Sequence, residues 1–532
     1  MTTSIPAEGL SYRPAGEEPP LLHGTVGELL RKSVEAAPER LAVIDGGPGA
    51  HRSWTYRRFL DCAERCARVL VQNFGPGARI GVWAANSPEW LILQQATALA
   101  GTPLVAINPA YKFSEFDYVV RDSGCVAVFH GVEHRGADLR AMAERAVAEI
   151  DHLTSAIGLS EWVGGTAAES AAGTRTVDLP RLCEHDVVLI QYTSGTTGAP
   201  KGVLLSHHSV INSANLVARR AGIEEGCVYV NPMPAFHVGS CGTVTLGTIC
   251  SAGTQVILPA FDAGRVLELV EEHRATVLLA VPTMQIAMLE HRDCGKRDLS
   301  SLRVVLTGGS TASADLVRRV KDVFGCKVSI TFGQSETGGP STQTNPDGEV
   351  REQVETIGRA LPHTEIKIID PATGETLPVG MQGEICSRGP MTMVGYLNRR
   401  ADQSLREDGW LHYGDLATMD GKGYLRIEGR LKDMIIRGGE NISPREIEEL
   451  LCTHPEVLGA AVVGVPDLKY GEQVAAFVRC VEKSTLTEDQ LTEFCSAHIA
   501  RHKVPRVWRL VSEFPLTPSG KVQKFKLREQ LA

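Results

Sequence analysis

Short apolar runs rich in β-branched residues alternate along the chain with helical patterns, and this alternation constrains the possible fold most. Strands that alternate with helices form largely parallel sheets with helices on both faces. Strands are expected within residues 78–84, 102–107, 125–131, 187–195, 254–259, 275–281, 301–309 and 326–333, and helices within 53–73 and 264–273. The sequence therefore predicts an α/β fold whose layered sheets are mainly parallel.

The pattern changes after about residue 365, where short β-like runs separated by turn residues indicate a small β-rich portion. A helix is expected after Ser443, with Pro444 at its first position and Glu446 completing a capping box. Two further strands and a helix follow, so the last hundred or so residues resemble an α+β domain. We expect an N-terminal domain of residues 1–431 and a C-terminal domain of residues 432–532.

Composition excludes several classes of protein. The chain has 532 residues, 43% hydrophobic and 22% charged, a net charge of −9 and a pI near 6.0, which argue for a globular protein without broad nucleic-acid binding. No apolar run is long enough to span a membrane, and no signal peptide is visible. The 13 Cys lack a CxxC pair, which suits reduced thiols and a cytoplasmic location.

The stretch QYTSGTTGAPKG, residues 191–202, combines Gly, Ser and Thr with one Lys. Glycines let the backbone approach a ligand, and hydroxyls with backbone N–H groups form an anion nest, so the loop suits a polyphosphate. It is not a P-loop, because Pro200 stands where that motif requires Gly. A mobile surface turn is the alternative, although apolar residues on both sides anchor the loop between buried elements.

Two further Gly-rich loops, LTGGS (306–310) and TFGQSETGG (331–339), follow apolar strands. Ligands bind at the carboxyl ends of strands in α/β sheets, so the three loops suggest one shared pocket. An acidic residue beside a phosphate site is costly unless a cation lies between them. We therefore expect Glu336 to hold Mg²⁺ with help from Thr193, although Glu336 could simply begin a helix.

Seven collinear segments between residues 192 and 524 closely resemble the motifs of the adenylate-forming enzymes, which include acyl-CoA synthetases, luciferases and peptide-synthetase adenylation domains. The segments are YTSGTTGAPKG, PMPAFH, LTGGS, TFGQSET, HYGD, GRLKDMIIRGGENISPREIE and PLTPSGKVQK. The FKLREQ stretch near the C-terminus resembles medium-chain acyl-CoA synthetases in particular. Such enzymes use ATP and Mg²⁺ to convert a carboxylate into an acyl-adenylate, and a thiol, usually that of coenzyme A, then displaces AMP.

The resemblance implies a nucleotide site built from several loops. The expected ligands of the β- and γ-phosphates are Thr193, Ser194, Gly195, Thr196, Thr197, Gly198 and Lys201. The expected walls around adenine are Gly308, Gly309, Ser310, Thr331, Phe332, Gly333, Gln334 and Ser335. Asp415 is expected to bind the ribose, and Arg430 the ribose and phosphate; a turn aspartate and a surface salt bridge are the plain alternatives.

The resemblance also implies functional residues in the C-terminal domain. Lys521, in PSGK, is expected to bridge the substrate carboxylate and the α-phosphate during adenylation. The small domain is expected to rotate about Lys432 between the two steps, because both steps use one pocket but need different partners near the phosphate. In the second pose the loop of Arg437, Gly438 and Gly439 would face the thiol tunnel.

His237, in PAFH, is expected beside the acid pocket or the thiol channel, with a core histidine as the alternative. His207 and His208 are interpreted as structural. The neighbouring residues expected at the pocket carry no charge, which favours a fatty or aryl acid over an amino acid: Val238, Gly239, Ser240, Cys241, Gly338 and Gly339. The FKLREQ resemblance alone suggests a medium-chain acid.

Three functions remain open at this point. The leading one is a carboxylate–CoA ligase acting on a small acid. The second keeps the adenylate but loads the phosphopantetheine of a carrier protein, or another nucleophile. The third is a non-catalytic binding protein, against which the joint presence of Lys201, Glu336, Asp415, Arg430 and Lys521 argues.

Overall fold

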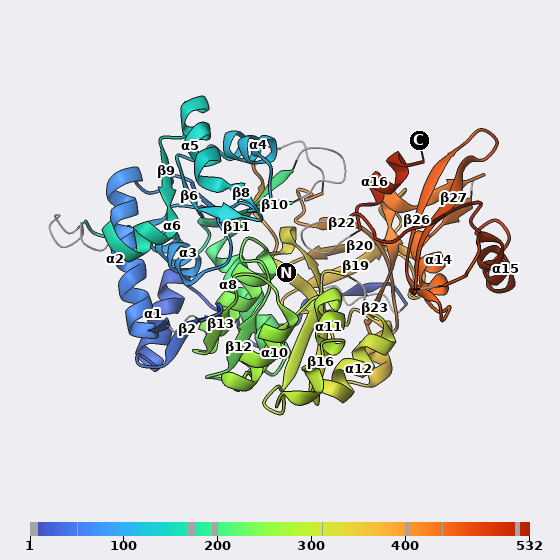
Figure 1. Ribbon diagram of the computed structural model, residues 1–532, viewed down its shortest axis with the longest axis horizontal. Helices are drawn as coiled ribbons and strands as arrows, with labels where there is room; N and C mark the ends of the chain where they lie inside the picture. The colour runs from blue at the N-terminus through green and yellow to red at the C-terminus, as the bar shows by residue number, and fades with distance from the viewer. Residues whose placement is uncertain are drawn as a thin grey trace. The chain divides into compact units, whose positions relative to one another are not determined.

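The computed structural model describes residues 9–49, 52–166, 177–193, 200–310, 312–398, 404–438, 440–482, 484–516 and 522–531. The chain forms two compact units (Figure 1). The larger unit comprises residues 14–365 and 387–411, and the smaller comprises residues 1–13, 366–386 and 412–532. The expected domain boundary between residues 431 and 432 falls inside the smaller unit and stays a prediction.

The larger unit contains a seven-stranded sheet with the strand order β21-β11-β10-β5-β4-β6-β9. Strands β10, β5, β4, β6 and β9 run parallel, whereas β11 and β21 are antiparallel additions at one edge. The strands are β4 (Ile80–Trp83), β5 (Leu104–Ala106), β6 (Ala127–His130), β9 (Ser155–Gly158), β10 (Val187–Thr193), β11 (Lys201–Ser206) and β21 (Gly395–Tyr396). The chain therefore passes through the QYTSGTTGAPKG stretch as the turn of the β10–β11 hairpin.

A second, nine-stranded sheet has the order β18-β17-β16-β15-β14-β12-β13-β2-β3, and the strands from β16 to β2 are parallel. Its strands are β2 (Leu41–Asp45), β3 (Ser53–Thr55), β12 (Val228–Asn231), β13 (Thr254–Ile257), β14 (Val277–Leu279), β15 (Val304–Gly308), β16 (Lys327–Gln334), β17 (Gly339–Gln343) and β18 (Arg359–Ala360). The prediction of layered, mainly parallel sheets is confirmed. The runs expected as strands are divided between two sheets.

Helices of two kinds surround these sheets. The expected helix within 53–73 is α2 (Tyr56–Phe74), which buries one stripe of residues, whereas every residue of α3 (Pro88–Ala100) is buried. An apolar stripe covers one surface, whereas α3 has no exposed face and lies in the interior although it carries polar residues such as Gln95. Other helices of this unit are α1 (Val26–Ala36), α4 (Phe113–Ser123), α5 (Leu139–Glu149), α8 (His207–Arg220), α9 (Thr245–Cys250) and α13 (Val350–Glu355). In the part of the chain that the structure describes, no helix is long and apolar enough to cross a membrane.

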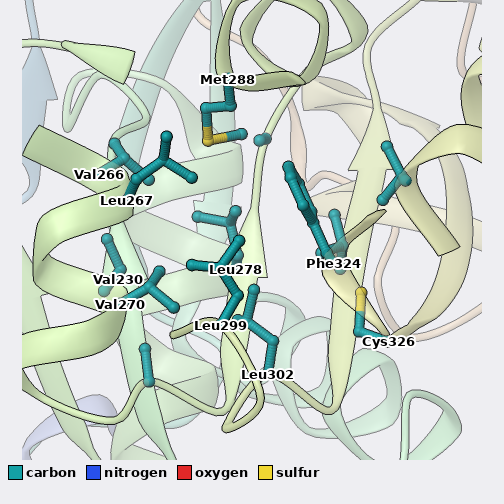
Figure 2. Packing of buried hydrophobic residues seen from close by; sticks show 14 of the residues in the cluster. Val230, Val266, Leu267, Val270, Leu278, Met288, Leu299, Leu302, Phe324 and Cys326 are labelled. Carbon is teal, nitrogen blue, oxygen red and sulfur yellow. The ribbon is translucent and has the colours of Figure 1, made fainter. Parts of the chain in front are cut away.

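One hydrophobic cluster joins the nine-stranded sheet to three helices, α10 (Ala263–Glu272), α11 (Pro282–Leu289) and α12 (Ala314–Phe324). Figure 2 shows Val266, Leu267 and Val270 of α10 on one side of Leu278 of β14, with Phe324 of α12 on the other. Close packing of such buried side chains makes an interior rigid. The cluster therefore gives the loops after β15 and β16 a firm base.

The smaller unit is rich in antiparallel strands. A five-stranded sheet with the order β1-β19-β20-β22-β23 is followed by a second sheet with the order β25-β24-β27-β26, in which β28 pairs with β27. The strands are β1 (Tyr12–Arg13), β19 (Glu365–Ile369), β20 (Gly383–Arg388), β22 (Leu411–Met419), β23 (Leu425–Arg430), β24 (Ile435–Arg437), β25 (Glu440–Ile442), β26 (Val457–Asp467), β27 (Gly471–Cys480) and β28 (Val507–Leu510). The helices are α14 (Pro444–Leu451), α15 (Glu488–His498) and α16 (Lys524–Glu529).

The predicted capping box of α14 is wrong, although Pro444 does occupy the first turn. The Ser443 hydroxyl donates instead to the carbonyl oxygen of Glu428, at 2.6 Å, and Glu446 pairs with Lys503 at 2.8 Å. These partners lie far away in the sequence. Tertiary contacts therefore take the place of the local cap.

Candidate active site

The ends of the β10–β11 hairpin are held firmly on both sides of its turn. Thr193 and Lys201 are cross-strand partners, and residues 194–199 lie outside the described part of the chain. The Tyr192 hydroxyl donates to Asp122 at 2.7 Å, and Tyr118 donates to the Pro200 carbonyl oxygen at 3.1 Å. Burial and the Asp122 carboxylate raise the pKa of Tyr192, so its hydroxyl keeps the proton that makes this contact. Helix α4 thus contacts the chain on both sides of the loop, at Tyr192 and at Pro200.

Tyr396 lies between two of the residues expected at the site. Strand β21 pairs with β11, which places the Tyr396 ring 5.0 Å from Lys201 Nζ in a cation–π contact. The Tyr396 hydroxyl donates to Glu336 Oε1 at 2.8 Å. Backbone bonds secure the arrangement, since Met393 N donates to the Glu336 carbonyl oxygen at 2.7 Å. One cation and one carboxylate, from different sheets, are therefore held on a single aromatic side chain.

Sequence reasoning missed Tyr396, although its segment is visible in the chain as VGYLN. Neither charge, nor glycine content, nor strand length singles it out. Its importance comes from the pairing of β21 with β11, which joins Val203 to Tyr396 in register. Only three-dimensional pairing of segments so far apart in the sequence reveals it.

The loops after β15 and β16 lie side by side, because these strands are parallel neighbours. A Cβ on Gly308 would lie 2.5 Å from the carbonyl oxygen of Thr331, so glycine is required for this approach. Gly309 has a φ of +79°, which also favours glycine. The two segments expected to line the adenine site, LTGGS and TFGQS, thus contact each other. Glu336 then lies in a short 3₁₀ turn, Ser335–Thr337, directly after β16.

Gly333 allows the closest backbone approach in this region. A Cβ there would lie 2.1 Å from the carbonyl oxygen of Gly339, which belongs to the paired strand β17. Neither backbone can yield easily, so Gly333→Ala is expected to lower the free energy of unfolding by about 1–3 kcal/mol, the usual effect of overpacking. Thermal denaturation with Gly295→Ala as control checks this, because a Cβ on Gly295 meets nothing within 4 Å. Equal midpoints for the two variants would contradict it.

The PMPAFH loop after β12 is tied to the same region. Gln191 of β10 donates to the carbonyl oxygen of Phe236, and Asn86 donates to that of Met233 at 2.9 Å. His237 Nδ1 accepts the Gly239 N–H at 3.2 Å, so a neutral His237 ring carries its proton on Nε2. The next turn, Gly239–Val244, lies against Gly338, whose carbonyl oxygen would lie 3.6 Å from a Cβ on Gly242. The uncharged residues expected at the acid pocket are therefore neighbours in space.

The expected ribose ligands pair with each other in the smaller unit. Asp415 and Arg430 are cross-strand partners, and Arg430 Nε donates to Asp415 Oδ1 at 2.9 Å. The Asp415 side chain is buried, with 6% exposed, whereas 46% of the Arg430 side chain is exposed. An exposed arginine over a buried aspartate leaves the guanidinium available to an anionic ligand.

Arg437 and Gly438 lie at the start of the second sheet of the smaller unit. The Arg437 guanidinium lies 4.5 Å from the centre of the Tyr470 ring, and Gly438 N donates to the Tyr470 carbonyl oxygen at 2.7 Å. Gly438 has a φ of +61°, which favours glycine. Ser194, Gly195, Thr196, Thr197, Gly198, Gly439 and Lys521 lie outside the described residues.

The residues present fit a nucleotide with its metal. Mg²⁺ prefers hard oxygen ligands, and Glu336 supplies a carboxylate oriented by a tyrosine hydroxyl. Lys201 brings a cation to the same cluster, which suits the phosphates that such a metal accompanies.

Two family models match the chain. The model described as AMP-binding enzyme matches residues 30–397, and the AMP-binding enzyme C-terminal domain matches residues 446–521. Among curated relatives, the putative acyl-CoA synthetase YngI of Bacillus subtilis is 38% identical over 96% of this chain and 97% of its own length. The mitochondrial medium-chain acyl-CoA ligase ACSF2 of Rattus norvegicus is 34% identical over 100% of this chain and 91% of its own length.

Solved structures give the same result. ATP-bound MatB from Rhodopseudomonas palustris matches with a TM-score of 0.86 and 30% identity, over 95% of this chain and 98% of that one. The o-succinylbenzoate CoA synthetase MenE of Bacillus subtilis, in complex with its acyl-adenylate intermediate, matches with a TM-score of 0.83 and 26% identity, over 96% of this chain and 98% of that one. With Lys201 and Glu336 of two motif-bearing segments in contact with Tyr396, these matches place the chain in the adenylate-forming acyl-CoA synthetase family of AMP-binding enzymes.

Proposed function

We propose that this enzyme activates a fatty acid of medium chain length with ATP and transfers the acyl group to the thiol of coenzyme A. The observation that carries the proposal is the cluster in which Tyr396 contacts both Lys201 and Glu336. It combines a cation for phosphate with a carboxylate for a metal. The medium-chain acid is supported by the name of the ACSF2 relatives and by the FKLREQ stretch.

The reaction has two balanced steps. A carboxylate oxygen attacks the α-phosphorus of ATP, a new P–O bond forms, and pyrophosphate leaves. The thiol sulfur then attacks the acyl carbon, a thioester forms, its proton passes to solvent and AMP leaves. Both attacks bring negative charge together, so positive groups and alignment must lower the barriers.

We assign the first step to the expected site residues. Lys201 and Thr193 bind the terminal phosphates, Glu336 holds Mg²⁺, and the bound Mg²⁺ supplies positive charge for those phosphates. Asp415 binds the ribose, Arg430 binds the ribose and phosphate, and Lys521 neutralises the charge that develops between carboxylate and α-phosphate. The expected C-terminal domain, residues 432–532, would then rotate about Lys432 and present Arg437 and Gly438 to the thiol.

The acid is expected to lie along the Gly239–Val244 turn. Val238, Cys241 and Gly338 lie together there and carry no charge, which favours an alkyl chain. His237 stands at the entrance of this region in our proposal and admits the carboxylate. An aryl acid remains the second candidate, because an uncharged pocket accepts a ring as well.

Pyrophosphate release over a panel of straight-chain and aryl acids tests this function. The highest kcat/KM is expected for a medium-chain fatty acid, with coenzyme A as acceptor. Preference for an aryl acid would overturn the chain-length proposal. The alternative acceptor, a carrier-protein phosphopantetheine, is tested in parallel: a thioester formed only on a holo carrier would show that the enzyme serves a biosynthetic assembly. Background pyrophosphate release with every acid would favour the alternative of a non-catalytic binding protein.

We place the protein in the cytoplasm, in keeping with its reduced thiols.

Tyr396→Phe should separate the two contacts of this residue. The ring beneath Lys201 remains, but Glu336 loses its hydroxyl donor, so Mg²⁺ binding should weaken. The Mg²⁺ concentration that gives half-maximal pyrophosphate release is expected to rise about 10-fold, as when a partner of a metal ligand is lost. Tyr56→Phe is the matched control, because it removes a tyrosine hydroxyl that donates to the carbonyl oxygen of Gly253, at 2.8 Å, and does not contact Glu336. An equal rise in both variants would contradict the assigned role of Tyr396.

A further inference from the structure

A second cluster of ligand-type side chains lies in the larger unit, outside the candidate active site. His23, Glu184 and His208 each offer one ligand atom, and these three atoms lie within 4.8 Å of one another. The Nδ1 atoms of His23 and His208 lie 3.3 and 3.8 Å from Glu184 Oε1. His185 Nε2 lies 3.7 Å from the same oxygen, and its ring centroid is 5.3 Å from that of His208. Three imidazoles therefore gather around one carboxylate.

The distances from Glu184 Oε1 to His23 and His208 are close to those between the ligands of a tetrahedral metal. Zinc–nitrogen and zinc–oxygen bonds of about 2.0–2.2 Å place neighbouring ligand atoms about 3.4 Å apart. The two Nδ1 atoms lie 3.3 and 3.8 Å from the carboxylate oxygen, within a few tenths of an ångström of that spacing. His185 does not belong to the set of ligand atoms that lie within 4.8 Å of one another, so it flanks the cluster.

The protein holds the cluster in place through neighbouring groups. The Gly24 N–H donates to Glu184 Oε2 at 2.8 Å, and the His208 N–H donates to the Glu184 carbonyl oxygen at 2.7 Å. Asn212 Nδ2 lies 3.0 Å from the carbonyl oxygens of both Leu22 and His208. Asn212 Nδ2 also lies 3.4 Å from His208 Nδ1, the longest of these three contacts. Such supporting contacts are typical of metal ligands.

The cluster is remote from the phosphate loop. Val187 pairs with Ser206 at one end of the β10–β11 hairpin, whereas Thr193 pairs with Lys201 at the other. The five residue steps of β11 between these ends span about 17 Å at about 3.4 Å each. Glu184 and His208 adjoin the first end, so this cluster is separate from the expected Mg²⁺ site.

We propose that His23, Glu184 and His208 form a three-ligand binding site for a divalent transition metal of the zinc or cobalt type, with water completing the coordination. Imidazole nitrogens favour these ions over Mg²⁺. A bound ion joins three segments: the chain before α1, the chain before β10 and the start of α8. The ion therefore stabilises the larger unit, because a ligand that binds only the folded state raises its stability.

Cobalt binding to the full-length, metal-stripped enzyme tests the site. One equivalent of Co²⁺ is expected to give the strong visible absorption of a tetrahedral nitrogen–oxygen site, and one equivalent of Zn²⁺ should displace it and raise the thermal midpoint. His23→Ala is a suitable variant, since 77% of this side chain is exposed and folding should tolerate the change. It should weaken Co²⁺ binding at least about 10-fold. His498→Ala is the matched control, because its Nδ1 bonds to the carbonyl oxygen of Phe494 in its own helix.

Glu184→Gln provides a further test, because it removes the charged ligand and keeps its shape. The variant should lose both the cobalt spectrum and the stabilisation by Zn²⁺. Unchanged Co²⁺ affinity in His23→Ala and Glu184→Gln would overturn the proposal. A thiolate charge-transfer band would overturn it too, since it would assign the ion to cysteines such as the exposed Cys183. Neither readout depends on ligase activity, so the outcome is independent of the proposed function.

Discussion

Lys521→Ala is expected to slow acyl-adenylate formation by about 10²-fold or more, the usual effect of losing a group that stabilises developing charge. The carboxylate and the α-phosphate are both anionic, and the lysine neutralises them only as the new bond forms. Thioester formation from a supplied acyl-adenylate should largely survive, because that step transfers an already activated acyl group. Single-turnover assays of the two half-reactions measure the effects separately.

Lys526→Ala is the matched control, because it removes an exposed lysine from α16, close to Lys521 in the sequence. It should leave both half-reactions unchanged. Equal losses of both half-reactions in Lys521→Ala would show that Lys521 supports the C-terminal portion and has no particular part in adenylation. Lys521→Arg sharpens the test: it keeps the charge but changes its position, so a partial recovery indicates a role for charge itself.

Glu336→Gln is expected to reduce kcat/KM for adenylation by about 10²-fold at a Mg²⁺ level that saturates the unmodified enzyme. The amide keeps the size of the side chain and can still accept from Tyr396, but it lacks the negative charge that attracts the metal. Raising Mg²⁺ should restore part of the activity. Pyrophosphate release measured over a Mg²⁺ series checks both expectations.

Glu355→Gln serves as the control, because Glu355 pairs with Arg351 one turn earlier in α13. The thermal midpoint of both variants should stay close to that of the parent protein. A Glu336→Gln enzyme with the parent's Mg²⁺ dependence would remove Glu336 from the metal site. A large loss of stability would instead identify it as a structural residue of the turn after β16.

The strands of the larger unit could be predicted because their signal is local. The run expected within 301–309 became β15, and that within 326–333 became β16. Continuous apolar runs of this length suit strands that are buried on both faces. The helix expected within 53–73 likewise became α2, because its apolar residues recur with helical spacing.

The assignment of strands to sheets could not be predicted, because pairing depends on distant segments. Strand β10 pairs with β5 in one sheet, whereas β15 and β16 lie in the other. The role of Tyr396 could not be predicted for the same reason, since it depends on the pairing of β21 with β11. At Ser443 the local rule failed, because a hydroxyl close to the Glu428 carbonyl oxygen formed a tertiary hydrogen bond in place of the cap.

The parallel pairing of β2 with β13 has a consequence for biogenesis. Asp45 pairs with Ile257, so a nascent chain must wait for about 210 more residues before β2 finds this neighbour. At a synthesis rate of about 5–20 residues per second, the delay is about 10–40 s. Until then the apolar run Leu41–Asp45 leaves the ribosome without its β13 neighbour, and exposed apolar strands of this kind attract chaperones or one another. Recovery of active enzyme from cells should therefore rise with chaperone supply.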